Sequence, residues 1–305
     1  MKIGDLKLKN PFFLAPMHQV NDIAFRILCK QNGCGLTYTW LINPLTREEL
    51  ILDDKPAVQI AAPSEKGIKE FIKKYENKAS LFDFNLGCPA VRAKEQDYGA
   101  YLQRYPSKVE KILKTMKNST TLPITVKVRK SPHIPKLMKI FDKYCNAIAI
   151  HPRTAEQGYS GIPDMEFAEK IKSKTDLPVI YSGDVDENNA LEVLKKFDFV
   201  MIGRKAIGNP AIFSKLIRSK ASGHAENQRF SSIAGNAQKL GISGTPKTWN
   251  VFHQYLKLAQ KYKIGFSDIK FHALNFTKGM DGAKKLRLEI SKAREIKDLK
   301  LLFER

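Results

Sequence analysis

The sequence contains few cysteines, and the four present, Cys29, Cys34, Cys88 and Cys145, do not form a CxxC motif. Such a count excludes a disulfide scaffold and a cysteine-based zinc site, and it is typical of a reducing compartment. No HExxH motif occurs, and no second His, Asp or Glu is spaced to complete a site with His151, so we expect no metal. Runs of about 18 apolar residues are also absent. We therefore expect a cytoplasmic, monomeric protein without a membrane segment.

Acidic residues are scarce relative to basic ones, with 31 Asp and Glu against 52 Lys and Arg, which gives a formal net charge of +21. This excess predicts attraction to polyanions, with nucleic acid ahead of an anionic membrane surface. A solubilising surface is the alternative interpretation. The 305 residues, 43% of them hydrophobic, suffice for one large domain and a small one.

Eight short apolar or β-branched runs alternate with stretches of helical periodicity. The runs are residues 12–16, 36–42, 56–61, 80–86, 123–129, 146–151, 178–183 and 197–204. The helical stretches between them include 65–75, 108–117, 135–145, 165–173 and 188–196. Eight strands that alternate with helices favour a (β/α)8 TIM barrel. A doubly wound open sheet is the alternative, but no GxGxxG motif follows the first run.

The composition changes after residue 213. We predict a barrel domain over residues 1–220, a linker rich in Ser, Gly, Ala and Asn over 221–246, and a small all-helical domain over 247–305. Helical spacing is found at 248–262, 267–277, 283–292 and 295–303. Residues 239–305 carry 15 Lys and Arg against 6 Asp and Glu, which predicts a polyanion-binding module. A solvated lysine-rich face is the alternative.

In a TIM barrel the active site lies at the carboxyl ends of the strands, where this chain places polar residues. Strand alternation puts the aromatic residues of 81–86 toward the helix layer and leaves Asp83 and Asn85 pointing inward. The same alternation turns Lys127 inward, where it either pairs with Asp83 or meets a negative charge on a ligand. Gln59 adds an amide at the same rim, suited to a heteroaromatic ring.

The last two runs end in Ser182-Gly183-Asp184 and Gly203-Arg204. Glycines at these two strand ends allow backbone amides to approach an anion, which predicts a phosphorylated cofactor, although each glycine alone could be a plain turn. His151 and Arg153 follow the sixth run, and a His-Pro-Arg sequence at a barrel mouth also points to a binding site.

Together these motifs resemble those of the flavin-dependent tRNA dihydrouridine synthases. In chain order they are "FFLAPM" with the following "VND" and "FR" (12–26), "DFNLGCPA" (83–90), "ITVKVR" (124–129), "IAIHPRTAEQGYSG" (148–161), "PVIYSGDV" (178–185), "FVMIGRKAIGNPAIF" (199–213) and "FHALNFTKGMDGAKKLRLEI" (271–290). The resemblance covers almost the whole chain. It implies a TIM barrel that binds FMN, NADPH as the reductant, and tRNA as a substrate whose uridines are reduced to 5,6-dihydrouridine.

The resemblance also assigns roles to individual residues. Contacts to FMN are implied for Pro16, Met17, His18, Gln59, Lys127, His151, Ser182, Gly183, Asp184, Gly203 and Arg204. Contacts to the uracil are implied for Asn85 and Cys88, and we add His151 and Arg153, which could polarise its carbonyls. Candidate RNA contacts are Arg92, Lys94, His272, Lys278, Lys284, Lys285 and Arg287. The sequence departs from the family pattern at His18-Gln19, within "HQVND", and at Ser182, where asparagine is common.

The chemistry explains why a cysteine would follow a strand at the barrel mouth. Hydride addition at C6 of uracil leaves an enolate that needs a proton at C5, and a thiol, with an ordinary pKa of about 8.5, still holds its proton near neutral pH. Pro89 biases Cys88 toward extended geometry. A buried packing thiol is the alternative for Cys88. For the whole chain, the alternatives are a flavin dehydrogenase of a free pyrimidine, of the dihydroorotate type, and a non-catalytic tRNA-binding barrel.

Overall fold

The computed structural model describes residues 1–222, 248–280 and 282–303, and the chain forms two compact units. The first comprises Met1–His18 and Gly35–Gly203, and the second comprises Gln19–Cys34 and Arg204–Arg305. The predicted linker 221–246 lies outside the described residues except for its first two positions. Residues 19–34 and 204–220 cluster with the second unit, so the domain boundaries at 220 and 247 stay predictions.

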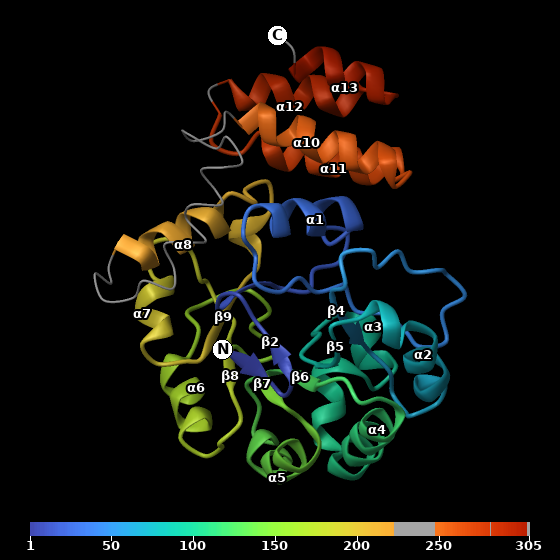
Figure 1. Ribbon diagram of the computed structural model, residues 1–305, viewed down its shortest axis with the longest axis vertical. Helices are drawn as coiled ribbons and strands as arrows, with labels where there is room; N and C mark the ends of the chain where they lie inside the picture. The colour runs from blue at the N-terminus through green and yellow to red at the C-terminus, as the bar shows by residue number, and fades with distance from the viewer. Residues whose placement is uncertain (223–247, 281, 304–305) are drawn as a thin grey trace. The chain divides into compact units, whose positions relative to one another are not determined.

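A curled, all-parallel sheet of seven strands forms the centre of the first unit (Figure 1). The strands are β3 (Phe12–Leu14), β4 (Ala57–Ile60), β5 (Leu81–Leu86), β6 (Ile124–Arg129), β7 (Ala147–His151), β8 (Val179–Tyr181) and β9 (Phe199–Ile202). Their order is β3-β9-β8-β7-β6-β5-β4, so that strands consecutive in the chain are neighbours from β4 to β9. This is the order that the predicted TIM barrel requires.

The second predicted strand, residues 36–42, closes the barrel through isolated bridges. Parallel bridges join Phe13 to Leu36 on one side, and join Tyr38 to Ala57 and Ile42 to Ile60 on the other. The regular ladder is interrupted because the main-chain N–H of Gln59 donates to the hydroxyl of Thr39, 3.0 Å away, instead of to a main-chain carbonyl. The prediction of eight strand segments around a barrel is therefore confirmed, with one segment held by bridges alone.

Helices cover the outside of the sheet, as the helical periodicity predicts. They are α2 (Ile68–Tyr75), α4 (Pro106–Ser119), α5 (Ile134–Tyr144), α6 (Met165–Lys172) and α7 (Ala190–Leu194), all visible around the sheet in Figure 1. In α5 the buried residues Leu137, Phe141 and Tyr144 recur at helical spacing and form the face that covers the sheet. Shorter pieces follow β5, namely α3 (Val91–Glu95) and the 3₁₀ helix η2 (Gly99–Arg104). A 3₁₀ turn, η1 (Glu76–Lys78), extends α2.

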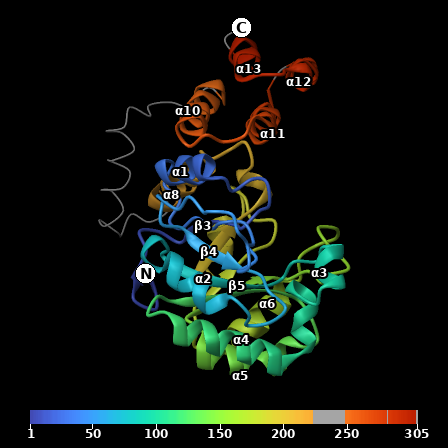
Figure 2. The ribbon, with the colours of Figure 1, turned by 90° about the vertical axis from the view of Figure 1, so that its right-hand side faces the viewer.

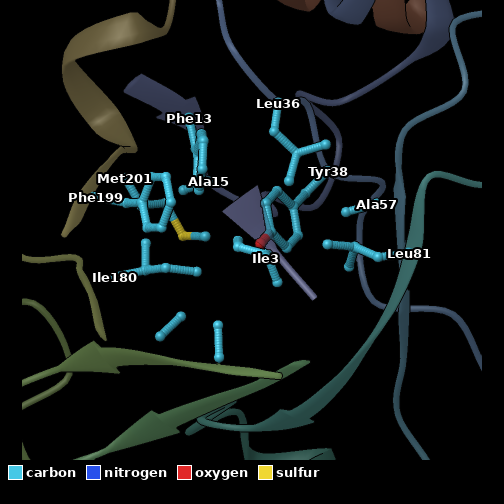
Figure 3. Packing of buried hydrophobic residues seen from close by; sticks show 12 residues of the cluster. Ile3, Phe13, Ala15, Leu36, Tyr38, Ala57, Leu81, Ile180, Phe199 and Met201 are labelled. Carbon is cyan, nitrogen blue, oxygen red and sulfur yellow. The ribbon is translucent and has the colours of Figure 1, made fainter. Parts of the chain in front are cut away.

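Apolar side chains fill the barrel interior toward the amino ends of its strands (Figure 3). Phe13 and Phe199 stack with ring centroids 4.9 Å apart. Ile3 joins this cluster from an amino-terminal hairpin of β1 (Lys2–Ile3) and β2 (Leu6–Lys7). A Cβ at Gly4, in the turn of the hairpin, would lie 3.2 Å from Pro123, which precedes β6. The hairpin therefore plugs the amino-terminal end, so a ligand of the barrel is expected at the carboxyl-terminal rim.

The second unit is helical throughout its described residues. It contains α1 (Ile23–Gln31), the 3₁₀ turn η3 (Arg204–Ala206), α8 (Ile212–Ser222), α10 (Thr248–Lys261), α11 (Phe266–Phe276), α12 (Ala283–Lys292) and α13 (Ile296–Phe303). Figure 2 views the last four helices nearly end on. The predicted carboxyl-terminal helices are confirmed, whereas α1 was not predicted. No helix among the described residues is both long and apolar enough to cross a membrane.

A buried carboxylate joins three helices of the second unit. Asp22 caps α1 by accepting a hydrogen bond from the amide of Phe25, 2.8 Å away, and it accepts another from the hydroxyl of Tyr255 on α10, 2.9 Å away. Nε2 of His272 on α11 lies 3.0 Å from the same carboxylate. Burial alone would raise the pKa of Asp22, but His272, the amide and the hydroxyl together lower it below 3.8. The charged carboxylate therefore links α1, α10 and α11.

Replacing Tyr255 with phenylalanine removes the hydroxyl that donates to Asp22 and leaves the ring in place. We expect the free energy of unfolding to fall by about 1.5–3 kcal/mol, the usual range for a hydrogen bond to a charged group. Urea unfolding measures this change. Tyr262→Phe is the matched control, because the hydroxyl of Tyr262 makes no hydrogen bond within the described chain. Equal losses in the two variants would contradict the role given to Asp22.

Candidate active site

Polar side chains replace the apolar cluster at the carboxyl-terminal rim of the barrel. In the strand register Asn85 of β5 lies beside Lys127 of β6, and Arg129 of β6 lies beside His151 of β7. Gln59 and Asp83 are paired one layer below. Asp83 and Asn85 point inward because they lie an even number of positions from the interior residue Leu81. Lys127 shares this face because it is paired in register with Asn85 and with the interior residue Ala149. The predicted inward direction of Asp83, Asn85 and Lys127 is therefore confirmed.

A buried series of hydrogen bonds connects the sheet to the cysteine loop, residues 86–90, which carries Cys88. Asp83 accepts from the hydroxyl of Thr125 at 2.6 Å and from Nε2 of Gln59 at 2.7 Å. Oε1 of Gln59 in turn accepts from Nδ2 of Asn85 at 2.7 Å. Oδ1 of Asn85 then accepts the amide of Cys88 at 2.8 Å. Four side chains from three strands thus hold one end of the cysteine loop.

The carbonyls of the same loop are held from other directions. Nε2 of Gln103 donates to the carbonyl of Leu86 at 2.6 Å, and the amide of Ala100 donates to the carbonyl of Cys88 at 3.0 Å. Nε of Arg129 donates to the carbonyl of Gly87 at 2.9 Å. Because both main-chain groups of Cys88 are bonded, its Cα–Cβ direction is fixed before any ligand arrives. Cys88 is partly exposed, whereas the other three cysteines are buried.

Lys127 brings a positive charge to the rim without a fixed counterion. It is partly buried, and no hydrogen bond or ion pair to its ammonium is found among the described residues. Burial lowers its pKa to about 8, helped by the charge of Arg129 and opposed by Asp83 and Cys88. Burial likewise raises the pKa of Asp83 to about 6, against the hydrogen bonds from Gln59 and Thr125. A cation in this position can stabilise negative charge on a bound molecule.

His151 is the neutral group of the site. Its side chain is buried, and its pKa falls to about 2 because of burial and of the positive charges of Lys127, Arg129 and Arg153. It therefore stays uncharged over the physiological range, and a neutral imidazole can donate one hydrogen bond and accept another.

Most hydrogen bonds of the Arg153 side chain are made to the loop that follows β7. It is only 1% exposed, and it donates to the carbonyls of Ser160 at 3.0 Å and Gly161 at 2.5 Å. Its Nη2 also lies 2.5 Å from Asp184. Among the described residues its Nη1 has no hydrogen-bond partner. These contacts support a role in positioning the loop and Asp184, and a contact between Arg153 and uracil stays a prediction.

The two glycines predicted to approach an anion differ in what surrounds them. A Cβ at Gly183 would lie 3.2 Å from Pro163 and 3.3 Å from Pro152, so packing alone accounts for glycine there. A Cβ at Gly203 would meet nothing closer than Ala15 at 3.6 Å, and no left-handed backbone requires glycine at that position. The protein itself therefore does not explain Gly203, but a ligand that closely approaches the backbone would.

The other residues assigned to a cofactor follow strands of the sheet, and Arg204 belongs to the second unit. Pro16 and Met17 are partly buried directly after β3, and His18 is exposed. Ser182 is buried, and its amide donates to the carbonyl of Ile150 at 2.8 Å. Arg204 is exposed at the start of η3, in the second unit. Contacts from these residues to a cofactor stay predictions.

Most candidate RNA contacts are exposed, but one is not. Exposed side chains are found at Arg92, Lys94, Lys278, Lys284, Lys285 and Arg287. His272 is wholly buried beside Asp22, so the prediction that it touches RNA is wrong. His272 is buried because α11 packs against α1. Since α1 was not predicted, this burial could not be inferred from the sequence.

Sequence reasoning also missed residues that shape the site. Gln103 and Arg129 hold the cysteine loop, although neither was assigned a role. Strand alternation could have identified Arg129, because it shares the inward face of Lys127. Gln103 lies in a 3₁₀ turn without a periodic pattern, and no signal in the sequence marks it.

Comparison with known proteins shows similarity in both sequence and fold. A family model described as "Dihydrouridine synthase (Dus)" matches residues 13–303. The tRNA-dihydrouridine synthase B of Vibrio vulnificus is 31% identical over 239 residues, covering 71% of this chain and 74% of that protein. The protein of the same name from Escherichia coli is 32% identical, with the same coverage of both chains. A probable tRNA-dihydrouridine synthase of Rickettsia bellii is 33% identical over 238 residues, covering 71% of this chain and 73% of that one.

Solved structures resemble the chain in fold. A mutant of morphinone reductase in complex with tetrahydroNAD has a TM-score of 0.54 at 13% identity, covering 72% of this chain and 90% of that one. The structure of TcOYE with pHBA has a TM-score of 0.56 at 9% identity, covering 72% and 91%. At such low identity the likeness supports the barrel fold alone.

The neutral state of His151 predicts a pH dependence of stability. Below its ordinary value of 6.5 the unfolded imidazole takes up a proton, which the folded protein does not bind until about pH 2, so stability is lost as the pH falls. In flavin-free protein, His151→Asn should lose less free energy of unfolding than wild type between about pH 7 and about pH 4. Urea titrations measure this, with His18→Asn as the exposed control. A His151→Asn curve parallel to wild type would contradict the assignment.

Proposed function

Because the chain belongs to the dihydrouridine synthase family, we propose that it reduces the C5=C6 bond of specific uridines in tRNA to 5,6-dihydrouridine. The proposal includes FMN as the bound cofactor, NADPH as the reductant and the cytoplasm as the place of the reaction. The observation that carries it is the cysteine loop, since Cys88 is the partly exposed thiol of the chain and is fixed at the barrel rim near Lys127, whose ammonium has no ion-pair partner in the described part of the chain.

Three features of the rim fit a flavin mononucleotide. The space at Gly203 suits a phosphate that approaches the backbone, and the partly buried ammonium of Lys127 suits the edge of the ring system that carries negative charge on reduction. Nη1 of Arg153, which has no hydrogen-bond partner in the described segments, adds a buried donor that a ligand could satisfy. When bound, the flavin would supply hydride to C6 of the uracil.

Cys88 would act as the general acid. A proton must reach C5 of the uracil as negative charge develops there, and the donor has to be held in place because proton transfer requires hydrogen-bonding distance. The hydrogen bonds to both main-chain groups of Cys88 provide this positioning. Neutral His151 and the amide of Asn85 would bind the carbonyl and imide groups of the uracil, with Lys127 contributing electrostatic stabilisation.

The basic surface would hold the nucleic acid. A uridine inside folded tRNA has to leave its stack to enter a barrel mouth, so the enzyme must grip the flanking backbone while the base is extruded. Arg92 and Lys94 on α3 are exposed directly after the cysteine loop, and Lys278, Lys284, Lys285 and Arg287 are exposed in the second unit. The net charge of +21 supports this assignment.

Replacing Cys88 with alanine should separate binding from chemistry. We expect Cys88→Ala to retain FMN and tRNA binding and to lose about a hundredfold or more of dihydrouridine formation, as expected for the loss of a general acid. Mass spectrometry of digested tRNA measures the product. Cys145→Ala, which removes a buried thiol, is the control and should keep the wild-type rate. Undiminished turnover in Cys88→Ala would refute the role of the thiol.

A methyl group at Gly203 should affect the cofactor and not the fold. Gly203→Ala adds a Cβ at van der Waals distance from Ala15 and Met17, so we expect an unchanged melting temperature. We also expect FMN to bind about tenfold or more weakly, because the methyl group would occupy the space of the phosphate. Flavin absorbance and fluorescence titration measure binding. Gly265→Ala is the control, since nothing lies within 4 Å of its Cβ. Wild-type FMN affinity in Gly203→Ala would contradict the proposed phosphate position.

A further inference from the structure

A pocket lies beside the cysteine loop, and the proposed reaction assigns no ligand to it. Its volume is about 300 Å³, within the range of small-molecule sites. Three segments line it, namely η2, the loop after β6 and the loop after β7. All three belong to the first unit.

The lining of this pocket combines aromatic rings, cations and hydroxyls. Tyr101 and His133 contribute rings, and Arg104 and Lys130 contribute positive charge. Ser131 and Thr154 contribute hydroxyls, and Glu156 contributes one carboxylate. Rings for stacking, cations for a phosphate and acceptors for amino or hydroxyl groups are the features of a nucleotide site.

The cations of the pocket are available to a ligand. Arg104 pairs with Asp97 at 2.8 Å, and Lys130 pairs with Asp164 at 2.5 Å. Both ion pairs are more than a third exposed, and exposed pairs contribute little to stability. A phosphate can therefore compete with the carboxylates without a large cost, and an arginine can bind it through two parallel hydrogen bonds.

The pocket is coupled directly to the loop of Cys88. Three residues that line it also bond that loop, since Ala100 donates to the carbonyl of Cys88, Tyr101 to that of Pro89 at 3.4 Å, and Gln103 to that of Leu86. The hydroxyl of Ser131, another lining residue, donates to Gln103. A ligand in the pocket would thus rest on the segment that fixes the proposed general acid.

We propose that this pocket binds one ribonucleotide, with its base against Tyr101 or His133 and its phosphate on Arg104 or Lys130. The inference rests on the proposed function, which supplies two sources of such a unit beside the active site. One is a nucleotide of tRNA adjacent to the target uridine, and the other is the adenosine phosphate end of NADPH. Both present the same chemistry to the pocket, and their separate binding constants distinguish them.

The test uses FMN-loaded protein and two variants that perturb the pocket in different ways. Arg104→Gln removes a charge, and Ala155→Phe fills volume while leaving every ion pair intact. Lys111→Gln is the control, because Lys111 is an exposed lysine paired with Glu65 and neither residue lines the pocket. The tRNA dissociation constant is measured by filter binding, and the NADPH constant by the concentration dependence of flavin reduction without tRNA.

The proposal predicts that both variants weaken the same ligand, by about tenfold, the effect of losing one charge-assisted hydrogen bond. Weaker tRNA binding alone assigns a flanking nucleotide, and weaker NADPH binding alone assigns the reductant. Wild-type constants for both ligands in both variants would overturn the proposal. Dihydrouridine formation by the wild-type protein is measured in parallel, so an inactive protein with pocket-dependent binding would contradict the proposed function and leave the pocket assignment standing.

Discussion

The hydrogen bond from the amide of Cys88 to the side chain of Asn85 is the contact on which the site depends. It converts a loop after a strand into a fixed extension of the sheet, because Asn85 is itself held through Gln59 to the buried carboxylate of Asp83. A buried polar group without a partner destabilises the fold, so each side chain in this series of hydrogen bonds fixes the position of the next. The cysteine is thus placed by the interior of the barrel.

The interior of the barrel is apolar at its amino-terminal end and polar at its carboxyl-terminal rim. Apolar side chains and the hairpin plug fill the amino-terminal end, which provides the stability of the unit, while the polar layers are confined to the rim. This arrangement leaves Lys127 partly buried, with no counterion among the residues that the structure describes, and it leaves His151 neutral among cations. Groups with such perturbed pKa values lower the stability of the fold. Their presence together at a barrel mouth is typical of a ligand-binding site.

Much of this organisation was predictable from local patterns. Alternation along 81–86 and 124–129 placed Asp83, Asn85 and Lys127 inward, because a strand has only two faces and the aromatic residues occupy one of them. Contacts between segments distant in sequence were not predictable. The burial of His272 depends on α1 lying against α11, and the bracing of Cys88 by Gln103 depends on a 3₁₀ turn without periodicity. Gly183 and Gly203 both follow a strand and look alike in sequence. Their neighbours in the structure differ, because packing accounts for glycine at position 183 and does not account for it at position 203.

The function proposed for this barrel is the reduction of uridine within tRNA. The most direct measurement incubates the FMN-loaded protein with NADPH and an unmodified tRNA transcript and maps the products by mass spectrometry after nuclease digestion. We expect particular uridines to gain two hydrogens while NADPH is oxidised in equal amount. NADPH oxidation that proceeds with free uracil and leaves every uridine of the tRNA unchanged would contradict it.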